Sequence, residues 1–252
     1  MLLFCNIIKN QEEINFTIIM KGITMIEFKN VFKEYGNGVM ALSNLNMVVP
    51  RGDFVFLVGP SGAGKSTLVK LLIREEKVTR GNILIKGTDI TKLKKSRVPK
   101  LRRDISVVFQ DFRLLAKKNV FENVAYPLEV QGESKKNIKI AVEHALELVN
   151  LEDKIKSYPY ELSGGQSQRV SIARAIVNKA PTLVCDEPTG NLDHETAWEV
   201  MNTLEKINNQ GTTIIMATHA VEIVNSMKKR VITLKDGQVV ADVENGGYYE
   251  NI

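Results

Sequence analysis

The stretch GPSGAGKST, at residues 59–67, directly follows the apolar run FVFLV of residues 54–58. It matches the pattern G-x-x-x-x-G-K-[ST], which ends here in Gly64, Lys65 and Ser66. Glycines in such a loop let backbone N–H groups close around a phosphate, where a Cβ would obstruct them. A helix that begins near Lys65 points its positive end at the same anion. A strand, this loop and a helix in sequence predict a nucleotide-binding α/β domain rather than a chance glycine-rich turn.

Two side chains of the loop suit the chemistry of nucleoside triphosphates. Lys65 places a positive charge beside the β and γ phosphates, and the hydroxyl of Ser66 is a suitable ligand for Mg²⁺. The loop therefore predicts a nucleotide that binds together with Mg²⁺.

The composition is that of an ordinary soluble protein. Of 252 residues, 44% are hydrophobic and 25% are charged, with a formal net charge of +5. Two cysteines, Cys5 and Cys185, permit one disulfide at most, which favours a reducing compartment. No apolar run approaches the roughly 20 residues of a membrane span, and residues 1–14 lack the basic start of a signal peptide. We therefore expect a protein that reaches a membrane only through a partner.

The N-terminal part divides at Met25. Residues 1–24 show no regular pattern and are expected to be an over-long start or a disordered lead. From Met25 apolar and polar residues alternate as in a strand, and further strands are expected at residues 41–49 and 54–58. Tyr35, on the loop after the first strand, is either a half-buried aromatic or a platform for a nucleotide base.

A basic run follows the strand and turn that begin at Gly81. Its members are Lys92, Lys94, Lys95, Arg97, Lys100, Arg102 and Arg103. No aromatic residues interleave with them, so the stacking pattern of single-strand nucleic-acid binders is missing. A solvated helix face is the simpler interpretation, and a docking surface is the alternative.

Polar side chains end three apolar strands of the predicted sheet. The strands are expected at residues 105–109, 183–185 and 212–217. Gln110 follows the first, where its amide could reach Mg²⁺ or a water, because ligands collect at the carboxyl ends of strands in α/β sheets. Asp186 and Glu187 follow the second, where they suit Mg²⁺ and a general base on the attacking water, respectively. His219 follows the third, where an imidazole could contact the γ-phosphate. Paired surface acids are the alternative for residues 186–187, but the buried strand before them disfavours it.

The apolar spacing becomes helical from Asp111 to about Leu162. Pro127, Gly132 and Pro159 are expected to divide this region into short helices. A helical insertion between strands of an α/β core is the simplest interpretation.

A second helix with an anion-binding start is predicted at residues 162–177, LSGGQSQRVSIARAIV. Ser163 fits an N-cap, and Gly164 and Gly165 leave the backbone open. A glycine-containing cap without any ligand has the same pattern, so both interpretations stand on these residues alone.

The order of these motifs resembles that of the ABC-type ATPases. GPSGAGKST, Gln110, LSGGQ, LVCDEP, NLD and the Thr-His pair ending at His219 are similar to the Walker A, Q-loop, signature, Walker B, D-loop and switch-histidine motifs. This resemblance implies a P-loop NTPase fold at residues 25–252, an ABC nucleotide-binding domain with a RecA-like core. It further implies an antiparallel β subdomain holding Tyr35 and an α-helical subdomain at about residues 111–172.

Finer features narrow the resemblance. The segments VPKLRR, FQDFRLL and IREEKVTRG look like those of the FtsE family, and the last of them is closer to its Gram-positive branch. Members of that family are cell-division ATPases that pair with the membrane protein FtsX.

The resemblance implies a set of site residues. Around the nucleotide it places Tyr35 under the adenine and, at the phosphates, Gly59, Pro60, Ser61, Gly62, Ala63, Gly64, Lys65, Ser66 and Thr67. It assigns Ser66, Gln110 and Asp186 to Mg²⁺, and it assigns catalytic roles to Glu187 on water, His219 on the γ-phosphate and Gln110. The nucleotide of the opposite subunit would be bound by Ser163, Gly164, Gly165 and Gln166.

By the same resemblance the chain is expected to hydrolyse ATP as a head-to-tail homodimer. It would lie on the cytoplasmic face of the cell membrane at the division site, bound to an integral membrane protein of FtsX type that indirectly controls a peptidoglycan hydrolase. No nucleic-acid partner is expected. The ATPase of a related macrolide or lipoprotein-release exporter shares every chemical motif and remains an alternative. A soluble ABC ATPase acting on DNA or ribosomes would usually carry two cassettes or a long coiled-coil insertion, and neither occurs here.

The chain departs from the family pattern at three places. Ser167 stands where glutamine is usual, residues 116–117 replace a proline-containing turn, and Ala220 follows His219 where an aspartate is common. Ala220 removes a carboxylate beside the switch histidine, so the dimer contact or turnover could be weaker.

Overall fold

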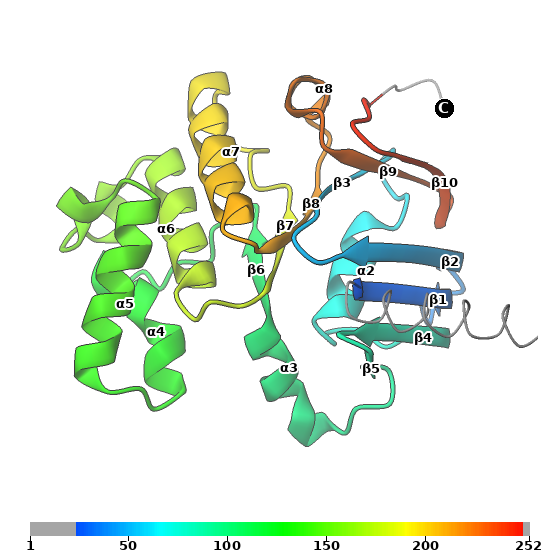
Figure 1. Cartoon of the computed structure of the whole chain (residues 1–252), viewed down its shortest axis with the longest axis horizontal. Coiled ribbons are helices and arrows are strands. Elements are labelled where there is room, and N and C mark those ends of the chain that lie inside the picture. The colour runs from blue at the N-terminus through cyan, green and yellow to red at the C-terminus, as the bar shows by residue number, and fades with distance from the viewer. Residues whose placement is uncertain (1–23, 249–252) are drawn as a thin grey trace, which may run out of the picture.

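The computed structural model describes residues 24–248, which form two β-sheets with helices packed around them (Figure 1). The strands are β1 (Thr24–Glu34), β2 (Met40–Pro50), β3 (Phe54–Val58), β4 (Arg80–Ile85), β5 (Thr88–Asp89), β6 (Ile105–Phe109), β7 (Thr182–Asp186), β8 (Thr213–Ala217), β9 (Arg230–Lys235) and β10 (Gln238–Val243). The α-helices are α2 (Lys65–Leu72), α3 (Val98–Asp104), α4 (Val120–Val130), α5 (Lys135–Leu148), α6 (Gly164–Ile176), α7 (His194–Asn209) and α8 (Val221–Met227). The expectation for the first 24 residues falls outside the described residues, apart from Thr24, which begins β1.

The α/β core is a six-stranded sheet in the order β10-β9-β3-β8-β7-β6. Neighbours from β9 to β6 run parallel, and β10 is an antiparallel edge strand. Every residue of β3 and β8 is buried. Continuous apolar runs are typical of parallel strands that are covered on both faces. One face packs in a cluster with α4 to α7, and the other packs with α2 and the second sheet.

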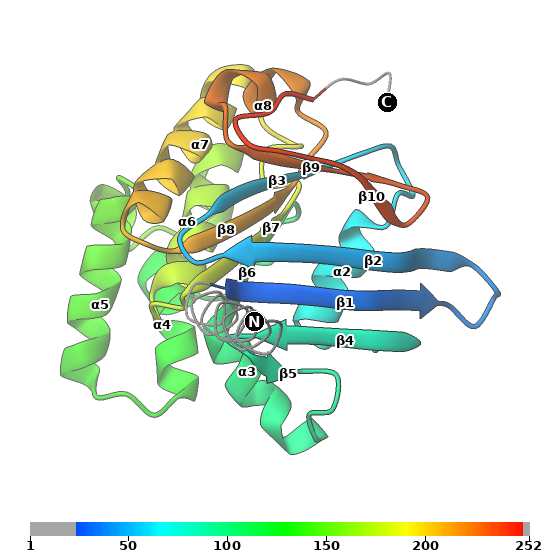
Figure 2. The same ribbon diagram turned by 45° about the vertical axis from the view of Figure 1, so that its right-hand side comes forward.

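The second sheet is antiparallel, in the order β2-β1-β4-β5 (Figure 2). The strands expected at residues 41–49 and 54–58 are confirmed as β2 and β3, but they belong to different sheets. The turn at residues 50–52 therefore carries the chain from the antiparallel sheet into the core. Tyr35 follows β1 directly, as expected for this subdomain.

The parallel register brings several strand ends to one edge. Asp186 lies beside Phe109 on one side and beside Ala217 on the other, and Ala217 also lies beside Leu57. The residues that follow these strands, including Gln110, therefore gather at the same edge as the glycine loop.

Helices α4 to α6 lie together at one side of the core (Figure 1). Asn119 and Glu122 form a reciprocal capping box at the start of α4. The prediction that Pro127 divides this region is wrong, because α4 continues through it to Val130. The apolar face of the helix, which includes the buried Leu128, continues past the proline and outweighs the loss of one intrahelical hydrogen bond. Between residues 24 and 248, no helix has the length and apolarity needed to cross a bilayer.

Candidate nucleotide-binding site

The glycine loop joins β3 to α2 and leaves the start of that helix open. Gly64 precedes α2 with φ 104°, and a Cβ on it would lie 2.6 Å from the carbonyl oxygen of Ala41. A glycine is therefore required at this position. No side chain caps the helix, so its first N–H groups are available to a ligand. A phosphate at this point would satisfy them and would complement the helix dipole.

Lys65 is buried, and its ammonium bonds to the loop's own backbone. Its Nζ donates to the carbonyl oxygens of Gly59 at 2.7 Å and Pro60 at 3.2 Å, and it lies 3.0 Å from Nε2 of His219. Burial lowers the pKa of Lys65, although nearby carboxylates oppose this shift. A phosphate group would offer this desolvated cation a stronger partner than neutral carbonyls.

Asp186 ends β7 opposite the start of α2. The hydroxyl of Ser66 donates to its Oδ1 across 3.4 Å. Burial raises the pKa of Asp186, and the Ser66 hydroxyl and the Lys65 charge only partly offset this. A desolvated carboxylate beside a hydroxyl is an oxygen donor pair that fits Mg²⁺, which usually takes few protein ligands and completes its shell with phosphate oxygens and water. Residues 24–248 contain no cluster of three acidic, histidine or cysteine side chains that could hold a metal unaided.

Glu187 is held between β7 and β8 in an unusual conformation. Its φ is 52°, its backbone N–H donates to the carbonyl of Ala217, and its Oε2 accepts from the backbone N–H of His219 at 3.3 Å. Burial raises the pKa of Glu187, and the nearby His219 opposes this shift. A carboxylate that is both desolvated and fixed in place is suited to act as a general base.

His219 lies between the cation and the base. Its Nε2 is 3.3 Å from Oε1 of Glu187 and 3.0 Å from Nζ of Lys65. A ring nitrogen accepts from Lys65 in one tautomer and donates to Glu187 in the other, so it serves one partner at a time. The imidazole can thus change partners when a ligand draws Lys65 away.

Gln110 reaches the same edge, but its amide bonds elsewhere. Nε2 donates to Oδ1 of Asn191 at 3.0 Å, and Nδ2 of Asn191 returns a bond to the Gln110 carbonyl at 3.4 Å. The structure therefore brings Ser66 and Asp186 together and places Gln110 beside Asn191. Asn191 was missed by sequence reasoning, although its place in NLD, shortly after the β7 carboxylates, could have indicated it.

Tyr35 adjoins the loop from the antiparallel sheet. Its hydroxyl lies 3.2 Å from Oγ1 of Thr67, and the ammonium of Lys33 sits 4.7 Å from the ring centroid. The ring is half-buried. Both interpretations of this residue, an ordinary packed aromatic and a base platform, are compatible with that position.

The segment Ser163–Gln166 forms a separate helix start at α6. The Oγ of Ser163 accepts from the N–H of Gln166, and the Gln166 side chain accepts from the N–H of Ser163. A Cβ on Gly165 would meet Thr196 of α7 at 1.9 Å, so this glycine allows close helix packing. Ser163 and Gly164 are exposed. Between residues 24 and 248, no hydrogen bond or ion pair joins this segment to the glycine loop.

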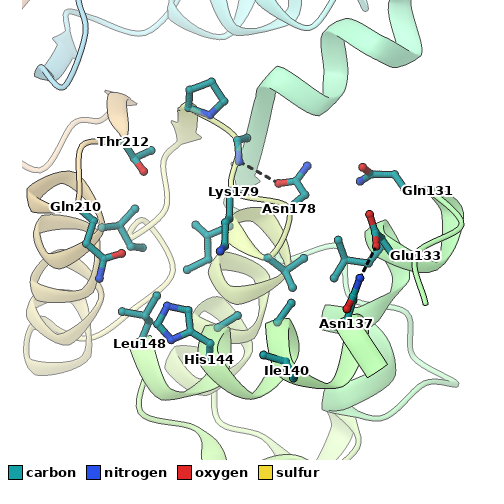
Figure 3. A pocket seen from close by; sticks show the side chains of 18 of the residues that line it. Gln131, Glu133, Asn137, Ile140, His144, Leu148, Asn178, Lys179, Gln210 and Thr212 are labelled. Carbon is teal, nitrogen blue, oxygen red and sulfur yellow. Dashed lines mark hydrogen bonds between the residues drawn. The ribbon is translucent and has the colours of Figure 1, made fainter. Parts of the chain in front are cut away.

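A cavity of about 940 Å³ lies elsewhere, between α5 and the C-terminal ends of α6 and α7 (Figure 3). Ile140, His144, Lys179 and Thr212 are among its lining residues. None of the predicted site residues lines it, so the cavity is distinct from the nucleotide site.

Comparisons with known proteins bear on the family of the chain. Residues 42–190 match the family described as ABC transporter. The cell division ATP-binding protein FtsE of Bacillus subtilis (strain 168) is 56% identical over 224 residues, covering 89% of this chain and 98% of that protein. The protein of the same name from Mycobacterium tuberculosis (strain H37Rv) is 48% identical, with coverage of 89% and 98%. A solved dimeric structure of the ATP-binding cassette MJ0796, in a post-hydrolysis state bound to ADP and Pi, is 36% identical with a TM-score of 0.79, covering 89% of this chain and all of that one.

Proposed function

Because this chain belongs to the FtsE family of ABC transporter ATPases, we propose that it couples ATP hydrolysis to a membrane partner in bacterial cell division. The chain is an ATPase with the P-loop NTPase fold. The observation that carries its chemistry is the convergence of Lys65, Asp186, Glu187 and His219 at one edge of the sheet.

Different side chains of the site have different roles in hydrolysis. Lys65 leaves the loop carbonyls and binds the β and γ phosphates, together with the open N–H groups of α2. Ser66 and Asp186 would hold Mg²⁺, which would supply charge neutralisation at the phosphate oxygens. Glu187 takes a proton from the attacking water, and burial strengthens it as a base. The backbone N–H of His219 keeps that carboxylate in place.

A second copy of the chain completes the site. Within residues 24–248, no hydrogen bond or ion pair joins the exposed start of α6 to the glycine loop of its own chain, and the MJ0796 cassette is a dimer in its solved structure. Ser163 uses an oxygen lone pair as a helix cap, so its hydroxyl proton is free to donate to a phosphate. Two chains arranged head to tail would therefore enclose two ATP molecules. Each ATP would lie between the glycine loop of one chain and the signature segment, Ser163–Gln166, of the other.

The partner is an integral membrane protein of FtsX type. The chain would bind it as a peripheral protein on the cytoplasmic face of the membrane at the division site. Closure of the dimer would move α4 to α6 and, through the region near Gln110 and Phe112, a cytoplasmic segment of that partner. The partner would in turn control a peptidoglycan hydrolase. The naming of the similar proteins as cell division proteins supports this assignment over an exporter.

A pull-down from detergent-solubilised membranes tests the proposal. The bait is the full chain carrying Glu187→Gln, with ATP, because slow hydrolysis should prolong the closed dimer. The control bait carries Lys65→Ala, which should fail to hold ATP. We expect the first bait alone to enrich an FtsX-type membrane protein, and we expect depletion of the chain to give filamentous or misshapen cells. Enrichment of an exporter subunit, with loss of export and normal cell shape, would overturn the division role.

A further inference from the structure

The turn after β6 has a backbone conformation that requires support. Phe112 and Arg113 are consecutive non-glycine residues with φ 55° and 50°. Left-handed backbone is uncommon for residues with side chains and persists where the surrounding structure holds it. Gln110 lies only two residues before this pair, so the conformation of the turn sets where its amide lies.

Arg174, near the C-terminal end of α6, donates two hydrogen bonds to this segment. Its Nη1 donates to the carbonyl oxygen of Arg113 at 2.7 Å, and its Nη2 donates to that of Phe112 at 2.8 Å. Burial lowers the pKa of the Arg174 guanidinium. Across residues 24–248 its hydrogen-bond partners are these two carbonyls, and no carboxylate pairs with it. The desolvated guanidinium thus bonds to two consecutive carbonyls and not to a carboxylate. We infer that its hydrogen bonds serve to fix the backbone geometry of this turn.

Other contacts brace the same turn. The guanidinium of Arg113 lies 3.6 Å from the ring centroid of Phe109 and 3.1 Å from Oδ1 of Asp111. These contacts stay within the segment of residues 109–113. The bonds from Arg174 are different, because they tie the segment to another element.

Helix α6 therefore has a function at each end. It begins directly after Ser163, and Arg174 lies ten positions beyond Gly164, about 15 Å along the helix axis. The signature segment and the turn that follows Gln110 are thus both attached to the same helix, α6. Any shift of α6 that moves Ser163 also pulls on the backbone beside Gln110.

We propose that Arg174 is a positioning residue that holds residues 110–113 in their left-handed turn and makes Gln110 move together with the signature segment. The inference rests on the proposed role of Gln110 at the nucleotide and its Mg²⁺. It adds a physical link between the two sites of the dimer. When the partner's nucleotide binds at Ser163 and shifts α6, the position of Gln110 beside the chain's own Mg²⁺ site would change.

A double-mutant cycle on the purified full chain tests this link. Arg174→Lys keeps the positive charge but loses the two-carbonyl fork. We expect it to lower kcat for ATP hydrolysis about tenfold and to raise the Mg²⁺ concentration needed for half-maximal rate, with the Kd of nucleotide measured without Mg²⁺ unchanged. In a Gln110→Ala background, Arg174→Lys should have no further effect on kcat, because both changes remove the same contribution.

The outcomes separate the two layers of the proposal. If Gln110→Ala leaves the rate unchanged, the assumed role of Gln110 fails. If Gln110→Ala lowers kcat and Arg174→Lys lowers it further in that background, Arg174 does not act through Gln110. Arg102→Lys is the matched control, because Arg102 also donates to a backbone carbonyl, that of Ile73, away from the site. The control should keep the parent kcat and Mg²⁺ dependence, and a similar loss in it would overturn the specific role of Arg174.

A second variant covers the case in which Arg174→Lys folds poorly. Glycine adopts the left-handed conformation without a side-chain penalty, so Phe112→Gly should lessen the need for the hydrogen bonds from Arg174 while keeping the contacts of the Arg113 guanidinium. We expect Arg174→Lys combined with Phe112→Gly to regain thermal stability and kcat relative to Arg174→Lys alone. Hydrogen exchange at residues 110–114 should be fast in Arg174→Lys and slower in the combined variant. An absence of recovery in all three measurements would overturn the proposal.

Discussion

The starts of α2 and α6 are both suited to an anion, but they are built in different ways. Helix α2 has no side-chain cap, and the buried Lys65 at its first position bonds to carbonyl oxygens. Helix α6 is closed by a reciprocal capping box between Ser163 and Gln166. The carboxylates of Asp186 and Glu187 lie near the first helix start, whereas the second lies exposed.

The difference suits the proposed sharing of one nucleotide by the two starts. The open start of α2 has no side-chain cap, so its first N–H groups are left to water or to a ligand. The capped start of α6 is stable without a ligand and can offer a hydroxyl proton when one arrives. In the proposed dimer, the glycine loop is the binding half of the site, and the segment Ser163–Gln166 is the half that a second chain would add.

The largest expected effect is on the α2 side. Glu187→Gln should preserve ATP binding and slow hydrolysis by about 10² to 10⁴, the range typical of a lost general base. Single-turnover hydrolysis, with ATP binding measured in parallel, checks this prediction. Near-normal turnover would remove Glu187 from the chemistry.

The next effect separates a cap from a ligand contact at α6. Ser163→Ala should reduce hydrolysis about a hundredfold, because it removes a donor to the partner's nucleotide. Ser134 is the matched control, since its Oγ caps α5 by accepting from the N–H of Asn137. Both alanine variants should lose about 1 kcal/mol of stability in urea titrations. If Ser134→Ala slowed hydrolysis equally, the α6 start would be a structural cap alone.

A smaller effect concerns the buried acid of the α2 side. Burial raises the folded-state pKa of Glu187 above its ordinary 4.5, so the fold favours the protonated form. The contribution of this carboxyl group to the free energy of unfolding is fully present below pH 4.5. It is lost as the pH rises through the folded-state pKa. Glu187→Gln should therefore raise Tm by a few degrees at pH 7 to 8, with the gain vanishing toward pH 4.5. Thermal melts across this range, with Glu129→Gln at an exposed position as control, would contradict us if the gain were independent of pH.

The smallest effect is expected at Tyr35. Tyr35→Phe loses only the contact with Thr67, so KM for ATP should change by no more than about twofold. Tyr35→Ala removes the ring, and loss of base stacking should raise KM about tenfold. An unchanged KM in Tyr35→Ala would leave the residue as an ordinary packed aromatic.

Local patterns were sufficient to predict much of this arrangement. The run at residues 54–58 and the helix start at Lys65 are confirmed, because a buried strand and a glycine loop are encoded in adjacent residues. The grouping of Gln110, Asp186 and His219 at one edge follows from the rule that parallel strands share their carboxyl ends.

Long-range contacts could not be predicted in this way. Asn191 is 81 residues from Gln110, and Arg174 is 61 residues from Arg113, so neither pairing leaves a local pattern. Pro127 misled the helix prediction because local propensity ignores the apolar face that tertiary packing rewards. The assignment of β2 and β3 to separate sheets likewise depends on partners far along the chain.

In the proposed dimer, each site combines the glycine loop of one chain with the signature segment of another. A mixing experiment tests this arrangement most directly, using Lys65→Ala chains and Ser163→Ala chains that are each nearly inactive alone. A mixed dimer has one intact site, formed by Lys65 of one chain and Ser163 of the other. We expect an equimolar mixture to regain about a quarter of the parent ATPase rate, because half of the dimers are mixed and each has one working site. A mixture no more active than the average of its two components would contradict the proposed arrangement.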